Sequence, residues 1–152
     1  MVDVVRGAIP DDIERCIELW VEALLDRDGS VDPLPVADRM RRLFDGPITR
    51  FALAGDPVDG FAVTAPKPGD PAVTVLERIA VRPASAGQGV GRLLLEDAIR
   101  SARSAGFTTM ELAVRTGNGA VRLYEKAGFR SASDPVPHPL GGEPMVTYRL
   151  EL

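Results

Sequence analysis

The chain has 152 residues, of which 45% are hydrophobic and 26% are charged, and its formal net charge is -4. These values predict one compact α/β or similar globular domain over residues 1–152, since domains most often contain about 100–150 residues. The acidic balance excludes an electrostatic surface for nucleic acid, and no apolar stretch reaches the ~20 residues that cross a bilayer. With one cysteine, Cys16, no intrachain disulfide can form. We therefore expect a cytoplasmic protein with no nucleic-acid or membrane partner and no metal.

The pattern of apolar residues and turn residues predicts alternating strands and helices along the whole chain. In chain order, these elements are a strand at Val2–Ala8, a helix from Asp11 to the turn at Asp28, a helix at Val36–Phe44, strands at Thr49–Ala54, Gly60–Ala65 and Val73–Val81, a helix at about Val90–Ala105, a strand at Thr108–Val114, a helix at Ala120–Ala127, and strands at Phe129–Ala132 and Met145–Leu152. No repeat or linker suggests a second domain.

Prolines and glycines set several of these boundaries. The turn Asp28-Gly29-Ser30 and the prolines Pro33 and Pro35 are interpreted as ending the first helix. Residues 66–71, which include three prolines, are interpreted as a connection between strands. In the longest strand, alternation places Val73, Val75, Ile79 and Val81 on one face. Glu77 interrupts that apolar face.

A glycine-rich turn connects this strand to the next helix, with the sequence Gly87-Gln88-Gly89-Val90-Gly91-Arg92. A helix N-terminus offers unpaired backbone N–H groups and a positive dipole end, and glycine lets a phosphate approach them. The run lacks the Gly-Lys-Ser/Thr ending of a Walker loop and the small third residue of a dinucleotide fingerprint. From spacing alone, a phosphate site and a turn without a ligand both remain open.

The stretch from Val81 to Leu94 resembles motif A of the GNAT N-acetyltransferase superfamily, Gln/Arg-x-x-Gly-x-Gly/Ala after a strand. The resemblance implies that the amides from Gly87 to Arg92 bind the pyrophosphate of acetyl-CoA. It also implies that the pantetheine arm lies along Ile79, Ala80 and Val81. Ala86 departs from the pattern, because it stands where the family has its first Gln or Arg.

A second resemblance lies further along the chain, where Leu123-Tyr124-Glu125-Lys126-Ala127-Gly128-Phe129 is similar to motif B, Leu-Tyr-x-x-x-Gly-Phe. Two motifs in this order are more specific than either alone. They imply a GNAT-type α/β (α+β) fold with about four helices and a mixed, mostly antiparallel sheet. The sheet is expected to splay where Val73–Val81 and Thr108–Val114 part to admit the cofactor.

The resemblance implies that Tyr124 is the general acid that protonates the departing CoA thiolate, although simple packing of its ring is the alternative. Asn118 is a candidate contact for the cofactor. The family's asparagine position falls on Gly117, however, so a helix N-cap role for Asn118 is equally open.

Glu77 is the candidate general base, since an amine must lose a proton to attack. A carboxylate on an apolar strand face also costs free energy unless it is functional or hydrogen-bonded. A salt bridge with Arg78 or a β-bulge is the alternative explanation. His138 is expected in a loop that borders the acceptor groove or in plain solvent. The acidic residues Asp26, Asp28 and Asp32 could attract a cationic amine or could form a solvated turn.

Together these features predict an acetyl-CoA-dependent N-acetyltransferase that acts directly on a primary amine of an unidentified small molecule or protein. A catalytically inactive acyl-CoA-binding sensor is the alternative, favoured by Ala86 and by the displaced Asn118. The resemblance leaves a homodimer through the C-terminal strands open.

Overall fold

The computed structural model describes residues 5–139 and 141–152. These residues form a sheet of seven strands in the order β1-β2-β3-β4-β5-β7-β6. The strands are β1 (Val5–Gly7), β2 (Arg50–Ala54), β3 (Gly60–Lys67), β4 (Asp70–Val81), β5 (Thr109–Arg115), β6 (Arg130–Ser131) and β7 (Met145–Glu151). The helices are α1 (Ile13–Asp28), α2 (Pro33–Leu43), α3 (Val90–Ser104) and α4 (Val121–Lys126), with short 3-10 turns η1 (Pro10–Asp12) and η2 (Pro83–Ser85).

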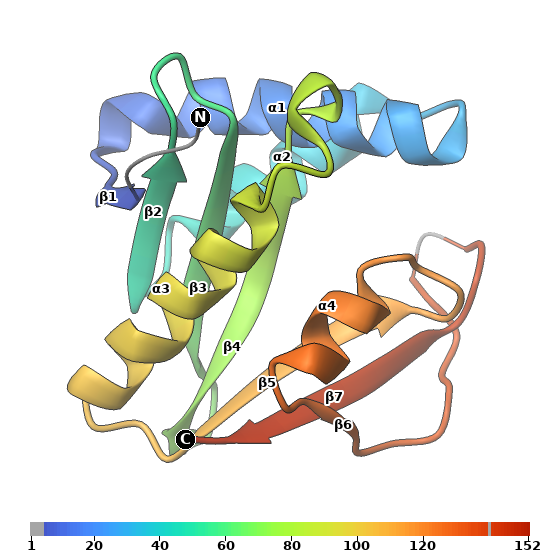
Figure 1. Ribbon diagram of the computed structural model, residues 1–152. Helices are drawn as coiled ribbons and strands as arrows, with labels where there is room; N and C mark the ends of the chain where they lie inside the picture. The colour runs from blue at the N-terminus through green and yellow to red at the C-terminus, as the bar shows by residue number, and fades with distance from the viewer. Residues whose placement is uncertain (1–4, 140) are drawn as a thin grey trace.

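The predicted order of strands and helices is confirmed, as is the mixed, mostly antiparallel sheet. Only β4 and β5 pair in parallel, and every other neighbouring pair is antiparallel. Figure 1 shows β4 and β5 meeting near the C-terminus and then diverging as the two arms of a V. The predicted strand at Val2–Ala8 is described only from Val5 onward, because residues 2–4 lie outside the described residues.

Two predicted boundaries are wrong, and both involve proline. Pro33 and Pro35 do not end α1, which stops at a left-handed Gly29; they lie in the first turn of α2. A proline is tolerated there because the first-turn N–H groups have no helical acceptor. The expected connection at residues 66–71 is also shorter, since β3 runs to Lys67 and β4 starts at Asp70.

The prediction that Val73, Val75, Ile79 and Val81 share one face is wrong because β4 contains a β-bulge. Val63 of β3 pairs with Arg78 and the next residue, Thr64, pairs with Leu76, so Glu77 is an extra residue without a cross-strand partner. One extra residue reverses the alternation of side chains along a strand. The two residues before the bulge therefore lie on the opposite face from the two after it.

Each face of the sheet has its own apolar core. Helices α3 and α4 cover one face, and the predicted stripe of α3, namely Val90, Leu94, Ala98 and Ala102, is at most 2% exposed. Helices α1 and α2 cover the other face, where Cys16 and Met40 pack with Phe61 of β3. In Figure 1, α3 and α4 lie on the same side of the sheet, one on each arm of the V.

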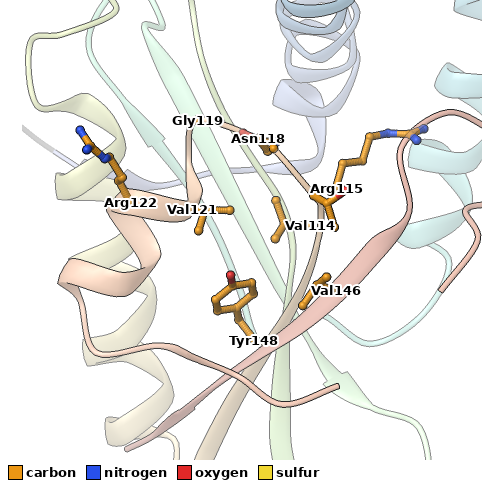
Figure 2. A pocket seen from close by; sticks show the side chains of 10 residues that line it. Val114, Arg115, Asn118, Gly119, Val121, Arg122, Val146 and Tyr148 are labelled. Atoms are coloured by element: carbon orange, nitrogen blue, oxygen red, sulfur yellow. The ribbon is translucent and has the colours of Figure 1, made fainter. Parts of the chain in front are cut away.

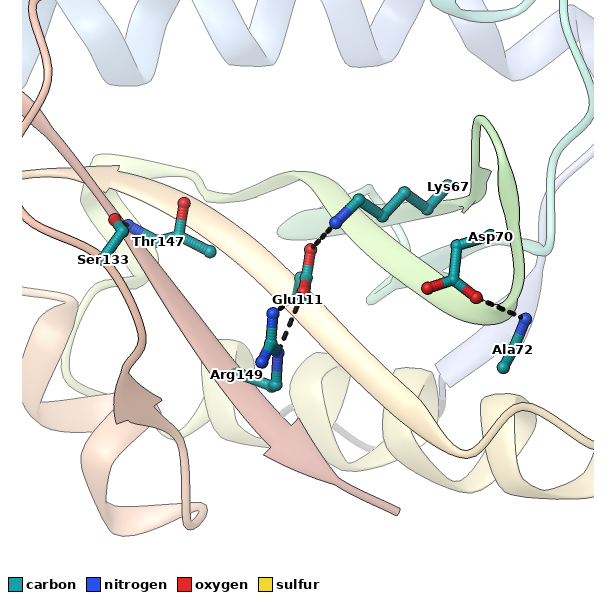
Figure 3. Close-up of polar contacts among 7 residues, drawn as sticks. All are labelled: Lys67, Asp70, Ala72, Glu111, Ser133, Thr147 and Arg149. Carbon is teal, nitrogen blue, oxygen red and sulfur yellow. Dashed lines mark hydrogen bonds and ion pairs between the residues drawn. The ribbon is translucent and has the colours of Figure 1, made fainter.

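An ion-pair network sits at the vertex of the V. The last residues that pair between the two arms are Val75 of β4 and Glu111 of β5. The Glu111 carboxylate accepts a hydrogen bond from Lys67 of β3 at 2.8 Å and two from Arg149 of β7 at 2.6 and 2.9 Å (Figure 3). The hydrogen bond from Lys67, followed by that from Arg149, lowers the pKa of Glu111 below its ordinary value. This buried carboxylate thus links three strands where the sheet divides.

Candidate active site

The splayed sheet leaves one edge of β4 without a strand partner. Pairing with β5 covers only Val73–Val75, whereas Ile79, Ala80 and Val81 pair with β3 on their other side. Backbone N–H and C=O groups along such an edge can pair with an extended ligand as they would with another strand. The three residues predicted to line the pantetheine arm therefore lie on an open edge inside the V.

The glycine loop follows directly from this edge and leads into α3. Gly87 and Gly89 have positive φ angles of 79° and 82°, which favour glycine. Gly89 is the N-cap of α3, and the first helical hydrogen bond runs from Leu93 N–H to the Gly89 carbonyl. The N–H groups of the three residues between them have no helical acceptor, and no described side chain caps them. The N-terminus of α3 therefore presents several unpaired backbone N–H donors close together.

Gly91 lies beside two neighbouring elements. A Cβ atom built at Gly91 would lie 3.4 Å from the Leu123 side chain of α4 and 3.7 Å from the Val81 side chain of β4, both ordinary van der Waals contacts. The start of α3 is therefore next to both elements, although packing alone does not require a glycine at this position. The two sequence motifs, separated by about thirty residues, meet at this point.

The glycine loop is anchored from behind by the β2–β3 turn, which the sequence did not reveal. The Ser85 hydroxyl donates a hydrogen bond of 2.7 Å to the Asp59 carboxylate. The Arg82 guanidinium donates to the Val58 carbonyl at 2.7 and 3.2 Å. These contacts connect both ends of η2 to a neighbouring turn, so the loop is held by several bonds rather than by glycines alone.

Tyr124 lies in α4 and is 6% exposed. Its ring packs edge-to-face against Phe129 with ring centroids 6.0 Å apart. Its hydroxyl makes no hydrogen bond with a described residue. Burial raises the pKa of Tyr124 to about 12, opposed slightly by the charge of Arg27 at the end of α1. The phenol is therefore neutral across the physiological pH range.

Asn118 serves the start of α4 and also lines a cavity. Its side-chain oxygen accepts a hydrogen bond of 2.9 Å from the Ala120 N–H, which closes a turn just before α4. The N-cap of α4 is Ala120, with no side-chain cap, so the N-cap role considered from the sequence is wrong. The cavity has a volume of about 390 Å³ and lies between the end of β5, the start of α4, and β7. Figure 2 shows Tyr148 of β7 pointing into it, with its hydroxyl toward Val121. The sequence patterns did not identify Tyr148.

Glu77 lies on the other side of the sheet from Tyr124. Because of the bulge, Glu77 and Arg78 both line a second cavity of about 600 Å³, below α2. The Glu77 carboxylate is 33% exposed, and its contact with the Arg78 guanidinium is long, at 4.0 Å. The salt bridge with Arg78, which was the alternative explanation for Glu77, is therefore weak. The carboxylate lines the cavity and is partly exposed.

His138 lies in the loop before β7, near three arginines. Desolvation lowers the pKa of its imidazole, and the charges of Arg115, Arg39 and Arg27 lower it further. The same loop is fixed by Arg115, which donates hydrogen bonds of 2.7 and 2.9 Å to the carbonyls of Gly141 and Glu143. Pro139 of this loop lines the second cavity together with Arg39 and Arg42 of α2.

Within residues 5–139 and 141–152, no helix has the length and apolar character needed to span a membrane. The same residues contain no group of three or more His, Cys, Asp or Glu side chains arranged to hold a metal ion.

Residues 14–129 match the Acetyltransferase (GNAT) family. Among characterised relatives, a ribosomal protein bS18-alanine N-acetyltransferase of Haemophilus influenzae is 40% identical over 70 residues, 44% of this chain and 48% of the relative. The chain thus matches about half the length of that relative. An uncharacterised N-acetyltransferase of Bacillus subtilis is 33% identical over 121 residues, 75% of this chain and 74% of the relative.

Solved structures agree on the fold. The structure of YncA from Salmonella typhimurium with its cofactor acetyl-CoA superposes with a TM-score of 0.75 at 21% identity, covering 99% of this chain and 94% of that one. The family match extends over both the glycine loop and the Leu-Tyr-x-x-x-Gly-Phe segment. The chain therefore belongs to the GNAT acetyltransferase family.

Proposed function

We propose that this protein is an N-acetyltransferase that transfers the acetyl group of acetyl-CoA directly to a primary amine. One observation carries the proposal: the uncapped N-terminus of α3 lies at the end of the unpaired edge of β4. A diphosphate attached to an extended arm matches this arrangement, because the amides suit the anion and the open edge suits the arm. Membership of the family supports a CoA thioester as the donor.

The cofactor is proposed to bind mainly through the backbone. The amides from Gly87 to Arg92 hold the pyrophosphate, and the pantetheine amides pair with Ile79, Ala80 and Val81 as an added strand would. Asn118 borders the smaller cavity beside this path. Ala86 supplies no polar side chain, so the backbone amides carry the binding.

Tyr124 is proposed as the general acid. The amine nitrogen attacks the thioester carbonyl carbon, and the tetrahedral intermediate then expels sulfur, which keeps the electron pair of the broken C–S bond. A thiol has an ordinary pKa of about 8.5, whereas burial raises the pKa of Tyr124 to about 12. Tyr124 is therefore protonated before each turnover, and it donates its proton to sulfur as negative charge develops there. Its hydroxyl has no competing partner among the described residues.

Glu77 is proposed as the general base that removes the proton of the attacking amine, directly or through one water molecule. Its partial exposure on the open side of the bulge supports access for a charged amine. The proton returns to Tyr124 through solvent, so the reaction yields an amide and free CoA. A direct transfer is supported by Cys16, which is fully buried and whose pKa burial raises to about 12.

A two-part experiment tests this function. Thermal shift with acetyl-CoA, ATP and NAD compares the ligands, and we expect stabilisation by acetyl-CoA alone. Release of free thiol is then measured with a broad panel of amines, and we expect turnover that depends on Tyr124. Tight binding of acetyl-CoA with no turnover on any amine would instead favour the acyl-CoA sensor.

The location and assembly of the protein are also proposals. One buried, reduced cysteine suits a reducing compartment such as the cytoplasm. Fractionation of cells would test this location, and light scattering of the purified protein would decide between a monomer and a homodimer.

A further inference from the structure

The larger cavity has a composition that the family assignment does not explain. It is lined by Arg39, Arg42 and Leu43 of α2, Glu77 and Arg78 of β4, and Pro139 of the loop before β7. Three guanidinium groups therefore face a single carboxylate. The chain as a whole has more acidic than basic residues, 22 against 18, so this local excess of positive charge does not follow from overall composition.

Arg78 is partly buried, with 17% of its side chain exposed. Its guanidinium lies 5.4 Å from the centroid of the Trp20 ring and donates one hydrogen bond of 2.7 Å to the Glu77 carbonyl. Its Nε is buried and has no hydrogen-bond partner among the described residues. Burial is the main cause that lowers the pKa of Arg78. The charge of Glu77 raises this pKa in part, and repulsion by Arg39 lowers it further. The cation is thus only partly compensated.

Arg39 and Arg42 show the same lack of compensation. Neither forms an ion pair with a described residue, whereas Arg41 between them bonds to Glu14 at 2.8 Å on the outer face of α2. Elsewhere in the protein, Arg50 is matched by a carboxylate, donating twice to Asp97 at 3.0 Å. Arg39 and Arg42 therefore have guanidinium donors left over at the cavity.

Of the three arginines, Arg39 and Arg78 are partly buried and Arg42 is exposed. A group of like charges that includes partly buried guanidiniums costs free energy unless an anion is bound among them. Their planar donors match carboxylate and phosphate oxygens. Glu77, on the same wall, suits the amino group of the same molecule. A volume of about 600 Å³ is sufficient for a small ligand.

We propose that the acetyl acceptor is a small amine that also carries an anionic group, with the anion bound by Arg39, Arg42 and Arg78 and the amine at Glu77. The inference rests on the proposed acetyltransferase function and narrows its substrate class. Polyamines are excluded, because a second ammonium group would lie among three guanidiniums. Asp28, considered from the sequence as an attraction for cationic amines, is instead bonded to Arg27 at 2.8 Å.

The test uses amines matched in pairs that differ only in the anionic group: glycine with methylamine, β-alanine with ethylamine, and phosphoethanolamine with ethanolamine. Ethylenediamine supplies the dication. We expect at least one anionic member to have a kcat/KM about ten-fold or more above its partner, since a hydrogen bond to a charged group contributes about 1.5–3 kcal/mol. The first two pairs test a carboxylate and the third pair tests a phosphate, so the comparison identifies which anion the cavity prefers.

Variants assign the preference to the cavity. Arg39→Gln and Arg42→Gln are each expected to raise the KM for the anionic amine about ten-fold and to leave the KM for acetyl-CoA unchanged. Arg41→Gln, on the outer face of the same helix, is the control and should change neither constant. A preference for uncharged amines or for the diamine would overturn the inference, as would an effect of the two variants on acetyl-CoA alone.

A binding measurement separates this inference from the proposed function. Calorimetry with protein saturated with CoA compares the two members of each pair without requiring turnover. Binding of the anionic member that is lost in Arg39→Gln, together with no thiol release, would support the cavity's specificity and refute the enzyme. Equal binding of both members in every pair would refute the specificity, whether or not acetyl transfer occurs.

Discussion

The two faces of the split sheet form sites of different kinds. On the α3 side, the candidate cofactor site consists of backbone N–H groups in one continuous run from Gly87 to Arg92. On the α2 side, the cavity at Glu77 consists of charged side chains from a helix, a bulged strand and a distant loop. A site made of backbone tolerates changes of side chain, as at Ala86. The ligand preference of a site made of side chains changes when those side chains are substituted. One face can therefore keep the same acetyl donor, acetyl-CoA, while the other face sets which amine is accepted.

The largest expected effect is at Tyr124, on the side of the sheet covered by α3 and α4. Tyr124→Phe removes only the hydroxyl, and we expect kcat to fall about 10²–10³-fold with little change in the KM for acetyl-CoA, because general acid catalysis contributes about that much. Steady-state thiol release measures both constants. Tyr148→Phe alters the only other tyrosine and is the matched control. A larger loss in that variant would transfer the acid role to Tyr148, which lines the smaller cavity.

The next largest effect is expected on the acceptor side. Glu77→Gln keeps the shape of the bulge and removes the base, so kcat/KM for the amine should fall about 10–100-fold near neutral pH. Raising the pH should restore part of the activity, since more of the free amine is then already neutral. A variant whose activity is equally low at every pH would show that Glu77 positions the acceptor and does not take its proton.

A moderate effect is expected on the cofactor side. Gly89→Ala forces alanine into a φ of 82° at the N-cap of α3 and should raise the KM for acetyl-CoA about ten-fold, equivalent to about 1.4 kcal/mol. Gly106→Ala introduces a similar strain at a φ of 91° beyond the other end of α3, also in open space. Both variants should lose similar thermal stability. If both also raise the KM equally, the glycine loop does not bind the cofactor.

The smallest effect on catalysis is expected at the vertex that joins the two arms. Glu111→Gln should lower the free energy of unfolding by about 1–3 kcal/mol and leave the kinetic constants unchanged. Because the folded-state pKa of Glu111 is lowered, its stabilisation is complete above the ordinary pKa of about 4.3 and is lost as the pH falls through the folded-state value.

Urea denaturation of both proteins between neutral and acid pH measures this difference. The stability gap between wild type and Glu111→Gln should close as the medium becomes acid. Glu151→Gln, at an exposed position on β7, is the control and should show a small and nearly constant difference. A gap that persists at low pH would mean that the charge of Glu111 is not what stabilises the vertex.

Sequence periodicity was most successful where a single element determines the outcome. The apolar stripe from Val90 to Ala102 is buried as predicted, because helical spacing alone selects the inner face. It failed in β4, where Glu77 is an extra residue and alternation reverses. The use of proline as a helix-stop signal was wrong at Pro33. A proline after the end of one helix and a proline in the first turn of the next helix cannot be told apart from the local sequence.

The sequence by itself determined the order of the elements, the glycine loop and the second motif, because turns, helix starts and backbone donors depend on neighbouring residues. Only the tertiary structure decided that Glu77 and Arg78 share a face and that Arg39 and Arg42 lie over them. It also decided that Glu111 joins Lys67 to Arg149 at the vertex. Those contacts connect segments more than thirty residues apart, and their geometry depends on one bulge and on the angle at which the sheet divides.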